Sequence, residues 1–332
     1  MRKKQIITAL MVLCMAFGLP GCKQNVGTPE DNAVVEEAED DADEAEKNRL
    51  FGFSCPDLSD PFYEVLKESV AVSLDGQGDR IMVRDAQCDP ETQTVQIQEM
   101  IDAGASAVFL IPSDPEGILP ALESLKEAGI PVVNLDIRIR DASLADAFVG
   151  ADNYSAGRFC AEDLMRRMPD GGRVGIIECT EISPVAERIN GFEETIQNAG
   201  FEITQRFQVK PGDEALLESG LRSALADENP PDVLMCGDDR MALAAMQVLR
   251  SEGRSDPIVY SVGGSPEVKS ALKETDSSLA GIGALSPINM GKTAVKTASV
   301  LLENGAYESD TYVETFFIDR ENIDMYGTDG WQ

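Results

Sequence analysis

The chain has 332 residues, of which 43% are hydrophobic and 26% charged, a composition too apolar for a disordered protein and too polar for one with several membrane spans. Its 28 basic and 59 acidic residues give a formal net charge of −31, which disfavours nucleic acid as a partner because phosphates attract positive surfaces. The chain contains no histidine, which excludes Ser-His and Cys-His catalytic pairs and the commonest zinc ligand. We therefore expect a binding protein without cofactor or metal rather than an enzyme.

The first residues are typical of a secretion signal. Three basic residues at positions 2–4 precede an apolar run at 6–17, which is too short to span a bilayer and suits the hydrophobic part of a signal peptide. Residues 19–22, Leu-Pro-Gly-Cys, resemble the lipobox of bacterial lipoproteins, although Pro20 departs from the small residue usual there. The resemblance implies cleavage before Cys22 and lipidation of its thiol. The alternative is an ordinary secretory signal with an incidental cysteine.

An acidic stretch follows this cysteine. Residues 29–47 contain ten Asp and Glu residues and only two large apolar ones, both valine, so the stretch cannot bury enough surface to fold, and its like charges keep it extended. A flexible chain of about 26 residues has a root-mean-square reach of roughly 28 Å. We interpret residues 22–48 as a tether that holds a globular body off the membrane. The alternative is a tail that binds cations or a partner, although it lacks the fixed spacing of a calcium loop.

From residue 49 onward, short apolar runs alternate with longer amphipathic segments. The apolar runs predict strands over 50–53, 80–84, 107–111, 132–135, 147–149, 173–177, 201–209, 233–236, 258–262, 279–284 and 312–317. The amphipathic segments predict helices over 61–74, 91–103, 115–128, 154–168, 186–199, 214–226, 240–251, 266–273 and 288–303. Continuous apolar strands indicate parallel sheets covered on both faces. Because the alternation occurs twice, we predict an α/β fold with two doubly wound parallel-sheet lobes.

Ligands of doubly wound sheets bind beyond the carboxyl ends of the strands, so the residues that follow each predicted strand are candidates for a site. These candidates are Asp60, Phe62, Tyr63, Asp136, Arg138, Arg188, Asp238, Gly263 and Leu285. Carboxylates and guanidinium groups form strong hydrogen bonds with hydroxyls, and the two aromatic side chains offer flat faces for stacking. The pattern predicts a cleft that binds a small polyol and closes by a hinge motion.

Several of these residues also have a purely structural interpretation. In this interpretation Asp60, which precedes a proline, is a helix cap and nothing more. The two aromatic residues then belong to the core, and Arg188 lies on a helix surface. Asp239 stands directly before the predicted helix at 240–251, so we interpret it as the cap of that helix and leave it out of the site. Asp136 directly follows a buried strand and is the strongest candidate.

Two kinds of motif are missing. No phosphate-binding Gly-x-Gly-x-x-Gly follows the first strand and no Walker A motif occurs, which argues against nucleotide cofactors and therefore against a dehydrogenase. The cysteines beyond position 22 are widely spread and lack any Cys-x-x-Cys pair, so they do not form a disulfide framework. They stand at positions 55, 88, 160, 179 and 236.

Six segments stand together in a specific order. They are DPFY at 60–63, IPVVNLD at 130–136, VGADN at 149–153, ERINGF at 187–192, GDDRMAL at 237–243 and GGSP at 263–266. Each is weak alone, but in this order the chain from about residue 49 to residue 317 resembles the type I periplasmic solute-binding proteins of the ribose- and galactose-binding family. The resemblance implies two lobes joined by crossovers near residues 150–152, 285–286 and 310–312, with the ligand between the lobes.

The division implied for the whole chain starts with a signal peptide at 1–21 and the tether at 22–48. The first lobe comprises 49–151 and 286–310, and the second comprises 152–285 and 311–332. By the same resemblance, the aromatic residues sandwich a sugar ring, while the acidic residues and an arginine bind its hydroxyls. The positions that match are Asp60, Phe62, Tyr63, Asp136, Arg188 and Asp238.

The chain departs from the sugar binders at four positions. Asp238 is usually an asparagine in that family, Gly263 stands in place of an aspartate, and Leu285 in place of a glutamine or asparagine. Ile137 replaces an arginine of the ribose binders, although Arg138 is adjacent. A buried hydroxyl left without a partner costs about 1–3 kcal/mol. We therefore expect a ligand other than plain ribose, glucose or galactose, with an apolar or bulky portion near Gly263 and Leu285.

We also expect an amine on the ligand that faces one of the carboxylates at positions 60, 136 and 238.

The resemblance leaves two functions that share one cleft. In the first, a lipoprotein anchored to the bacterial cell membrane captures a sugar-like small molecule outside the cytoplasm and delivers it to an ABC importer. In the second, the same body is a sensor that presents its closed form to a membrane histidine kinase or chemoreceptor. A sugar-responsive repressor shares the fold but needs an N-terminal DNA-binding region, where this chain has its signal and tether. We expect a monomer that touches the membrane through its lipid alone.

Overall fold

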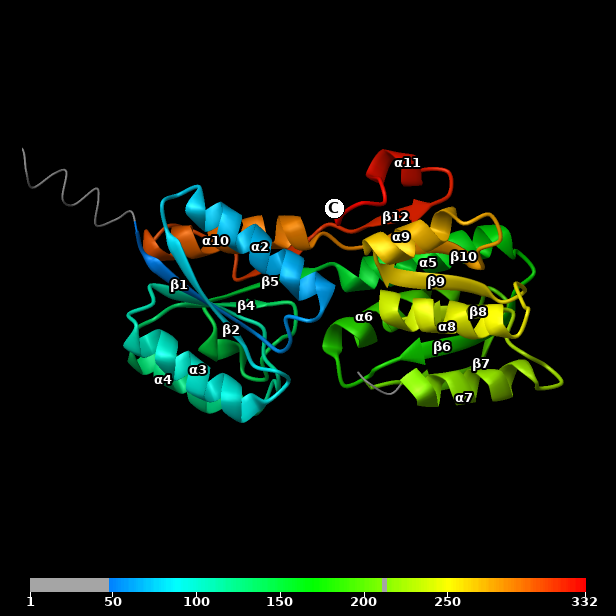
Figure 1. Cartoon of the computed structure of the whole chain (residues 1–332), viewed down its shortest axis with the longest axis horizontal. Helices are drawn as coiled ribbons and strands as arrows, with labels where there is room; N and C mark the ends of the chain where they lie inside the picture. Colours follow the sequence, from blue (N-terminus) through cyan, green and yellow to red (C-terminus); the bar gives the residue numbers. More distant parts are fainter. Residues whose placement is uncertain (1–47, 211–213) are drawn as a thin grey trace, which may run out of the picture. The chain divides into compact units, whose positions relative to one another are not determined.

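The computed structural model describes residues 48–210 and 214–332 (Figure 1). The expected signal peptide, Cys22 and the expected tether up to residue 47 lie outside the described residues. Within the described part, no helix combines the length and the apolar character needed to cross a membrane. The described residues belong to one compact unit, which is built from two six-stranded sheets.

The first sheet has the strand order β11-β5-β4-β3-β1-β2, and all of its neighbouring strands are parallel. Its strands are β1 (Leu50–Cys55), β2 (Arg80–Asp85), β3 (Ala107–Leu110), β4 (Val132–Leu135), β5 (Ala147–Ala151) and β11 (Asp310–Val313). It is accompanied by α2 (Pro61–Asp75), α3 (Pro90–Asp102), α4 (Leu119–Glu127), η1 (Ala142–Leu144) and α10 (Pro287–Leu302). Helix α2 packs against α10 on one side of the sheet and α3 against α4 on the other (Figure 1).

The second sheet has the order β12-β10-β9-β8-β6-β7, in which only β12 runs antiparallel to its neighbour. Its strands are β6 (Gly172–Glu178), β7 (Phe201–Gln208), β8 (Val233–Cys236), β9 (Ile258–Gly263), β10 (Leu279–Ala284) and β12 (Phe316–Asp319). Its helices are α5 (Asn153–Arg167), α6 (Ser183–Ile196), α7 (Glu214–Leu225), α8 (Asp239–Ser251), α9 (Pro266–Lys273) and α11 (Ile323–Tyr326).

The predicted α/β fold with two parallel-sheet lobes is therefore confirmed. The central strands carry apolar side chains on both faces because helices cover both faces of each sheet. In the first sheet, Phe51 and Phe109 are fully buried on adjacent strands, and their rings stack with centroids 5.9 Å apart. The edge strand β7 instead alternates between partly buried and exposed residues, as expected of a strand with one covered face.

The chain passes between the two sheets three times, and the third crossover differs from the prediction. The single strand predicted over 312–317 is wrong: β11 pairs with β5 of the first sheet and β12 with β10 of the second. The crossover therefore falls at Glu314 and Thr315, beyond the predicted 310–312. Apart from Glu314, the run from Thr311 to Phe317 has β-favouring residues, and it contains no turn residue to mark the exchange. The hydroxyl of Thr315 donates to the carbonyl of Asp152 (3.1 Å), which holds the first and third crossovers side by side.

Several helices begin at a capping side chain located just beyond a strand. These caps accept hydrogen bonds from the first turns of α2, α5, α8, α9 and α10, and they are Asp60, Asp152, Asp238, Ser265 and Ser286. Each satisfies a backbone N–H that has no partner within its helix. Polar side chains are thereby concentrated at the carboxyl ends of the strands, where the sequence predicts the site.

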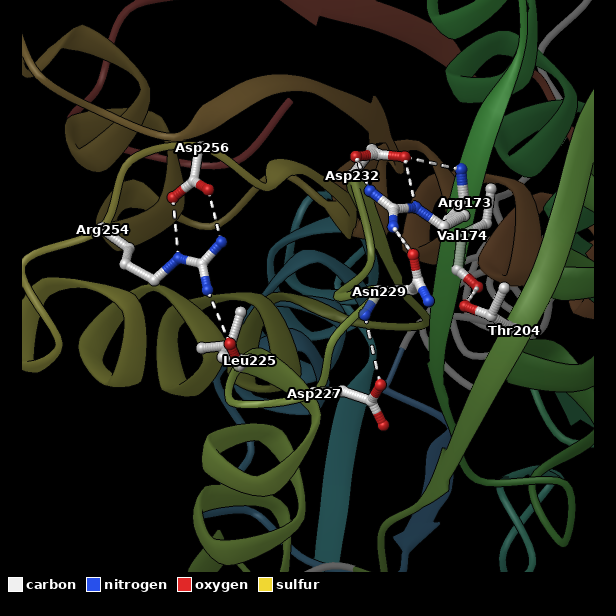
Figure 2. Close-up of polar contacts among 9 residues, drawn as sticks. All are labelled: Arg173, Val174, Thr204, Leu225, Asp227, Asn229, Asp232, Arg254 and Asp256. Atoms are coloured by element: carbon white, nitrogen blue, oxygen red, sulfur yellow. Dashed lines mark hydrogen bonds and ion pairs between the residues drawn. The ribbon is translucent and has the colours of Figure 1, made fainter.

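The amino ends of the strands in the second sheet are held by a different set of polar contacts (Figure 2). Arg173, at the start of β6, donates from Nη2 to Oδ1 of Asp232 (2.7 Å) and from Nε to Oδ2 (3.0 Å). Arg254 pairs with Asp256 and also donates to the carbonyl of Leu225 (2.7 Å). These pairs connect the loops that precede the strands, on the side of the sheet away from the predicted site.

Candidate ligand-binding site

A cavity of about 290 Å³ lies at the carboxyl ends of the strands and is lined from both sheets. Eight of the nine predicted ligand-binding residues line it, namely Asp60, Phe62, Tyr63, Asp136, Arg188, Asp238, Gly263 and Leu285. They come together because parallel strands of one sheet end at the same edge, which is where doubly wound proteins bind ligands. The ninth, Arg138, is not among the lining residues.

Asp136 is the most distinctive group of this cavity. It follows β4 in a left-handed conformation (φ 54°), which residues other than glycine seldom adopt. Its side chain is buried, with the residue only 7% exposed. Oδ2 accepts a hydrogen bond from the hydroxyl of Tyr63 (3.1 Å), whereas Oδ1 has no partner among the described residues. Because buried polar atoms are nearly always hydrogen-bonded, Oδ1 marks a place for a donor from a ligand.

Burial also changes the protonation of this pair. It raises the pKa of Asp136 to about 6, against the opposing effects of the Arg188 charge and the Tyr63 hydrogen bond. Burial likewise raises the pKa of Tyr63, and the negative charge of Asp136 adds to the increase. Tyr63 consequently keeps its proton and acts as a donor, while the charge on Asp136 titrates within the physiological range.

The first turn of α2 places two aromatic side chains in the cavity wall. Asp60 caps this helix by accepting from the backbone N–H of Phe62 (2.9 Å), and Pro61 occupies the first helical position, where its missing N–H costs no hydrogen bond. The rings of Phe62 and Tyr63 meet edge to face, with centroids 5.8 Å apart. Burial raises the pKa of the Asp60 carboxyl as well. Asp60 therefore serves as a cap and also lines the cavity.

Arg188 contributes a cationic group from the second sheet. It lies on α6 and is buried, so the interpretation as a surface residue is wrong. Its Nε donates to Oδ1 of Asn153 (2.8 Å), and its Nη1 donates to the carbonyl of Gly237 (2.9 Å). These two contacts hold the guanidinium group in place beside the cavity. Asn153, at the start of α5, positions Arg188, a role that sequence reasoning missed although Asn153 belongs to one of the six ordered segments.

The two consecutive aspartates before α8 have roles different from those predicted. Asp238 is the cap of this helix and accepts from the backbone N–H of Met241 (2.7 Å), so the interpretation of Asp239 as the cap is wrong. Asp239 lies in the first helical turn, and its buried carboxylate accepts from Ser261 Oγ (2.6 Å) and from two backbone N–H groups. Either aspartate fits the capping pattern in sequence. The tertiary structure decides which aspartate is the cap, because the carboxylate of Asp239 is hydrogen-bonded to the turn after β9.

Gly263 is explained by the same carboxylate. A Cβ atom on this residue would lie 2.5 Å from Cγ and Oδ2 of Asp239, so a side chain cannot fit unless Asp239 moves. The charge at this corner therefore comes from Asp239, which also lines the cavity. The backbone N–H of Leu285 donates to the carbonyl of Gly263 (2.7 Å), which brings this buried leucine beside the glycine as an apolar part of the wall.

Arg138 lies elsewhere. Its Nη2 donates to the hydroxyl of Tyr312 (2.5 Å) and approaches Oδ1 of Asp310 to 2.6 Å. Its guanidinium carbon stands 3.7 Å from the ring centroid of Phe148. The arginine is thus held over the edge strand β11 and its neighbour β5. The prediction that it contacts the ligand is not supported, because partners at the sheet edge, far away in sequence, engage its side chain.

Among the lining residues that the sequence reasoning missed, the one farthest along the chain is a tryptophan. Trp331, beyond the last predicted strand, lines the cavity, with its ring centroid 5.6 Å from that of Phe62. The only signal in the sequence is that it is the single tryptophan of the chain.

The balance of charge in the cavity is negative. Five acidic residues line it, four aspartates at positions 60, 136, 238 and 239 and Glu267, together with two arginines, at 188 and 240. Nη2 of Arg240 lies 3.6 Å from Oδ2 of Asp60 and 3.7 Å from Oδ2 of Asp238, so it spans the two sides of the cavity. Over the described ranges, no group of three or more Cys, Asp or Glu residues is arranged to hold a metal ion. The excess of carboxylates in the lining suits a ligand that offers several hydrogen-bond donors.

Comparisons with known proteins agree with the two-sheet fold. Residues 51–306 match the family described as a periplasmic binding protein domain. The ribose import binding protein RbsB of Bacillus subtilis is 28% identical over 268 residues, which cover 77% of this chain and 82% of that protein. An ABC transporter solute-binding protein from Mycobacterium smegmatis with bound glycerol is 25% identical, with a TM-score of 0.78 over 86% of this chain and 99% of that one. The Caulobacter myo-inositol binding protein is 25% identical, with a TM-score of 0.75 over 83% and 95% of the two chains.

Proposed function

From the premise that this chain belongs to the periplasmic binding protein family, we propose that it captures a sugar or sugar-like molecule and delivers it to an ABC importer. The chain is a solute-binding protein and not an enzyme. The observation that carries the proposal is the buried, unpartnered Oδ1 of Asp136, a residue that lines a cavity together with aromatic rings and a fixed guanidinium group.

The cavity chemistry suits a polyhydroxylated solute. Hydroxyl groups of the ligand donate to Asp136 and accept from Arg188, and such charge-assisted hydrogen bonds are stronger than neutral ones. The faces of Phe62 and Tyr63 cover C–H groups, which excludes water from the polar contacts. Relatives whose names include ribose import and myo-inositol binding support the same ligand class.

Ligand capture is coupled to closure because the two key polar groups belong to different sheets. Asp136 follows β4 of the first sheet, and Arg188 lies on α6 beside the second. A ligand that binds both groups is held most tightly when the two sheets approach each other, so it shifts the population toward the closed form. The importer would then receive its cargo by recognising this closed form.

The ligand we propose is more apolar and more cationic than a plain pentose or hexose. Leu285 offers no hydrogen bond to a hydroxyl, and Gly263 has no room for a side chain that would provide one. The excess of carboxylates over guanidinium groups favours a ligand with an amine. Isothermal titration checks this point: tight binding of D-ribose would contradict it, and tighter binding of an aminosugar than of its parent sugar would support it.

We further propose that the protein is a lipoprotein monomer held outside the cytoplasm by a lipid on Cys22. The proposal rests on the resemblance of residues 19–22 to a lipobox. Mass spectrometry of the protein extracted from membranes tests it, because diacylglyceryl modification adds a lipid mass to a peptide that begins at Cys22. A soluble product, or an unmodified cysteine inside a longer peptide, would contradict it.

A thermal-shift screen of sugars, aminosugars, cyclitols and linear polyols tests the central proposal. A compound present at 100 times its Kd stabilises the protein by roughly 2.7 kcal/mol, which raises the Tm visibly. Asp136→Asn is the matched variant, since it keeps the shape of the side chain and removes the charge of the acceptor. We expect the Tm shift to shrink in this variant. The absence of any shift with the whole panel in the wild-type protein would contradict the proposed function.

A further inference from the structure

Residues 327–332 form a short segment after α11 that is held against the second sheet. Gly327 turns the chain in the left-handed region (φ 70°). Lys269 on α9, which is fully buried, donates from Nζ to the carbonyl of Gly330 and to Oε1 of Gln332 (3.1 Å). A lysine is almost never fully buried without partners, and here the segment itself supplies them. The segment therefore has a defined position.

The end of this segment is attached at two further points. Ser286, at the second crossover, donates from Oγ to the carbonyl of Gln332. The side-chain amide of Gln332 donates to the carbonyl of Tyr326 (2.9 Å). A Cβ on Gly264 would lie 4.0 Å from Oε1 of Gln332, so the segment runs beside the turn that follows β9. These contacts place it next to the cavity.

Trp331 extends from this anchored segment into the cavity wall. Its side chain is partly buried, and its ring approaches Phe62 edge to face at 74°. The other aromatic side chains in the lining, Phe62 and Tyr63, both come from α2 beside the first sheet. Among the described lining residues, Trp331 is the sole aromatic side chain that the second sheet's side contributes. The indole thus adds a third aromatic ring to the cavity wall, in edge-to-face contact with Phe62 and attached from the second sheet's side.

We propose that Trp331 contacts the ligand directly and selects cyclic, sugar-like solutes whose C–H face packs against the indole. The inference rests on the proposed function and deepens it by naming the ligand shape. A pyranose or a cyclitol presents a flat patch of C–H groups, whereas an open-chain polyol presents such a patch only after it loses conformational freedom. The side chains at Leu285 and Gly263 offer no hydrogen bond to a hydroxyl, so an aromatic face beside them favours the apolar side of a ring.

The chain offers a direct probe, because Trp331 is its only tryptophan. Excitation at long wavelength therefore reports on this one side chain in the purified full-length protein. The probes are D-allose, D-glucosamine and myo-inositol as cyclic compounds, with allitol and glycerol as open-chain compounds. Thermal shift identifies which of them bind, and calorimetry gives their Kd values. We expect each cyclic binder to change the tryptophan emission saturably, with a midpoint that matches the calorimetric Kd.

Variants separate a direct contact from a distant effect of closure. We expect Trp331→Ala to weaken the Kd of a cyclic binder about tenfold or more, as truncation of a buried aromatic contact does, and to reduce the preference for cyclic over open-chain compounds. Trp331→Phe should recover most of the affinity. Tyr307→Ala is the matched control, since Tyr307 is 44% exposed and does not line the cavity, and its Kd should equal that of the wild type.

Each outcome decides between the two proposals. If compounds raise the Tm while the emission stays constant and Trp331→Ala binds within twofold of the wild type, this inference is overturned and the proposed function stands. If no compound raises the Tm, the proposed function fails and the inference fails with it. Should Trp331→Ala not fold, the emission titration of the wild-type protein and the Kd of Trp331→Phe still decide the question.

Discussion

At the amino ends of the strands, Arg49 pairs with Asp79 and Arg173 with Asp232, each at 2.7 Å between Nη2 and a carboxylate oxygen. Each of these aspartates also accepts from the backbone N–H of its own arginine at 2.9 Å. At the carboxyl ends, by contrast, Asp136 accepts from Tyr63 through one oxygen, and its other oxygen has no partner among the described residues. The aspartates at the amino ends are paired within the protein, whereas Asp136 at the carboxyl ends keeps one oxygen available for a ligand.

The pKa values point in opposite directions at the two ends. The hydrogen bond from Arg173 lowers the pKa of Asp232, so folding favours its charged form. Burial raises the pKa of Asp136, so folding disfavours its charged form. The charged form of Asp232 at the amino ends therefore stabilises the fold, whereas the charged form of Asp136 at the carboxyl ends destabilises it while remaining available to a ligand.

The largest expected effect is the pH dependence that Asp136 imposes on stability. Its pKa is raised from 3.8 to about 6 in the folded protein, so between pH 4 and pH 6 the unfolded chain loses its proton before the folded protein does. The stability contribution of this group therefore falls as pH rises through this window, by about 3 kcal/mol at most. Urea unfolding of wild type and Asp136→Asn at pH 4, 5, 6 and 7 measures it. We expect the free energy of unfolding of the variant to rise relative to that of the wild type as pH increases across this window. Parallel pH dependence in the two proteins would refute the raised pKa of Asp136.

A second prediction concerns the corner occupied by the Asp239 carboxylate. Gly263→Ala places a Cβ 2.5 Å from that carboxylate, and such overpacking costs about 1–3 kcal/mol. We expect a lower free energy of unfolding in urea, together with weaker ligand binding. Gly104→Ala is the matched control, because that glycine also has a positive φ (73°), but a Cβ added there would meet no atom within 4 Å. Equal losses in the two variants would show that backbone conformation, and not the carboxylate, explains Gly263.

A third prediction concerns Asp232, at the amino ends of the strands in the second sheet, where we expect the charged carboxylate to stabilise the fold. Asp232→Asn removes the charge from a bidentate ion pair that is partly exposed to solvent, so we expect a loss of about 0.5–1 kcal/mol in the free energy of unfolding at pH 7. Ligand affinity should not change, because the pair lies at the amino ends of the strands. Urea unfolding measures the loss of stability, and calorimetric titration measures the Kd. A change in Kd above threefold would contradict the claim that the amino ends of the strands do not affect ligand binding.

The smallest effect is expected at Arg138. Its guanidinium group is engaged by Asp310, Tyr312 and Phe148 and not by the cavity. Arg138→Ala should leave the Kd of a ligand within about threefold of the wild type, whereas Arg188→Ala should weaken it by tenfold or more, because hydrogen bonds to charged groups are worth about 1.5–3 kcal/mol. Comparable losses in both variants would place Arg138 in the site.

The sequence predicts what depends on local patterning. Strand and helix alternate with clear periodicity, and the polar residues that follow each strand identify most of the cavity without any knowledge of contacts. The misses are non-local. The choice between Asp238 and Asp239 as cap depends on the backbone of the turn at Gly264, and the position of Arg138 depends on partners in β11, far along the chain.

Trp331 shows the same limit most clearly. Nothing near it in sequence predicts a site residue, because a buried lysine on another helix holds its segment in place. The third crossover escapes prediction for a related reason. One β-favouring run serves two sheets, and only strand pairing reveals where it divides.

The central claim is that Oδ1 of the ionised Asp136 carboxylate, which has no partner among the described residues, receives a donor from the ligand. Its most direct test is a calorimetric titration of the first compound that raises the Tm, at pH 5 and pH 7.5, in wild type and Asp136→Asn. For an uncharged ligand, we expect tighter binding at pH 7.5 than at pH 5 in the wild type, because the pKa of Asp136 is about 6. We also expect weak binding, without that pH dependence, in the variant. Equal affinity in the two proteins at both pH values would contradict the claim.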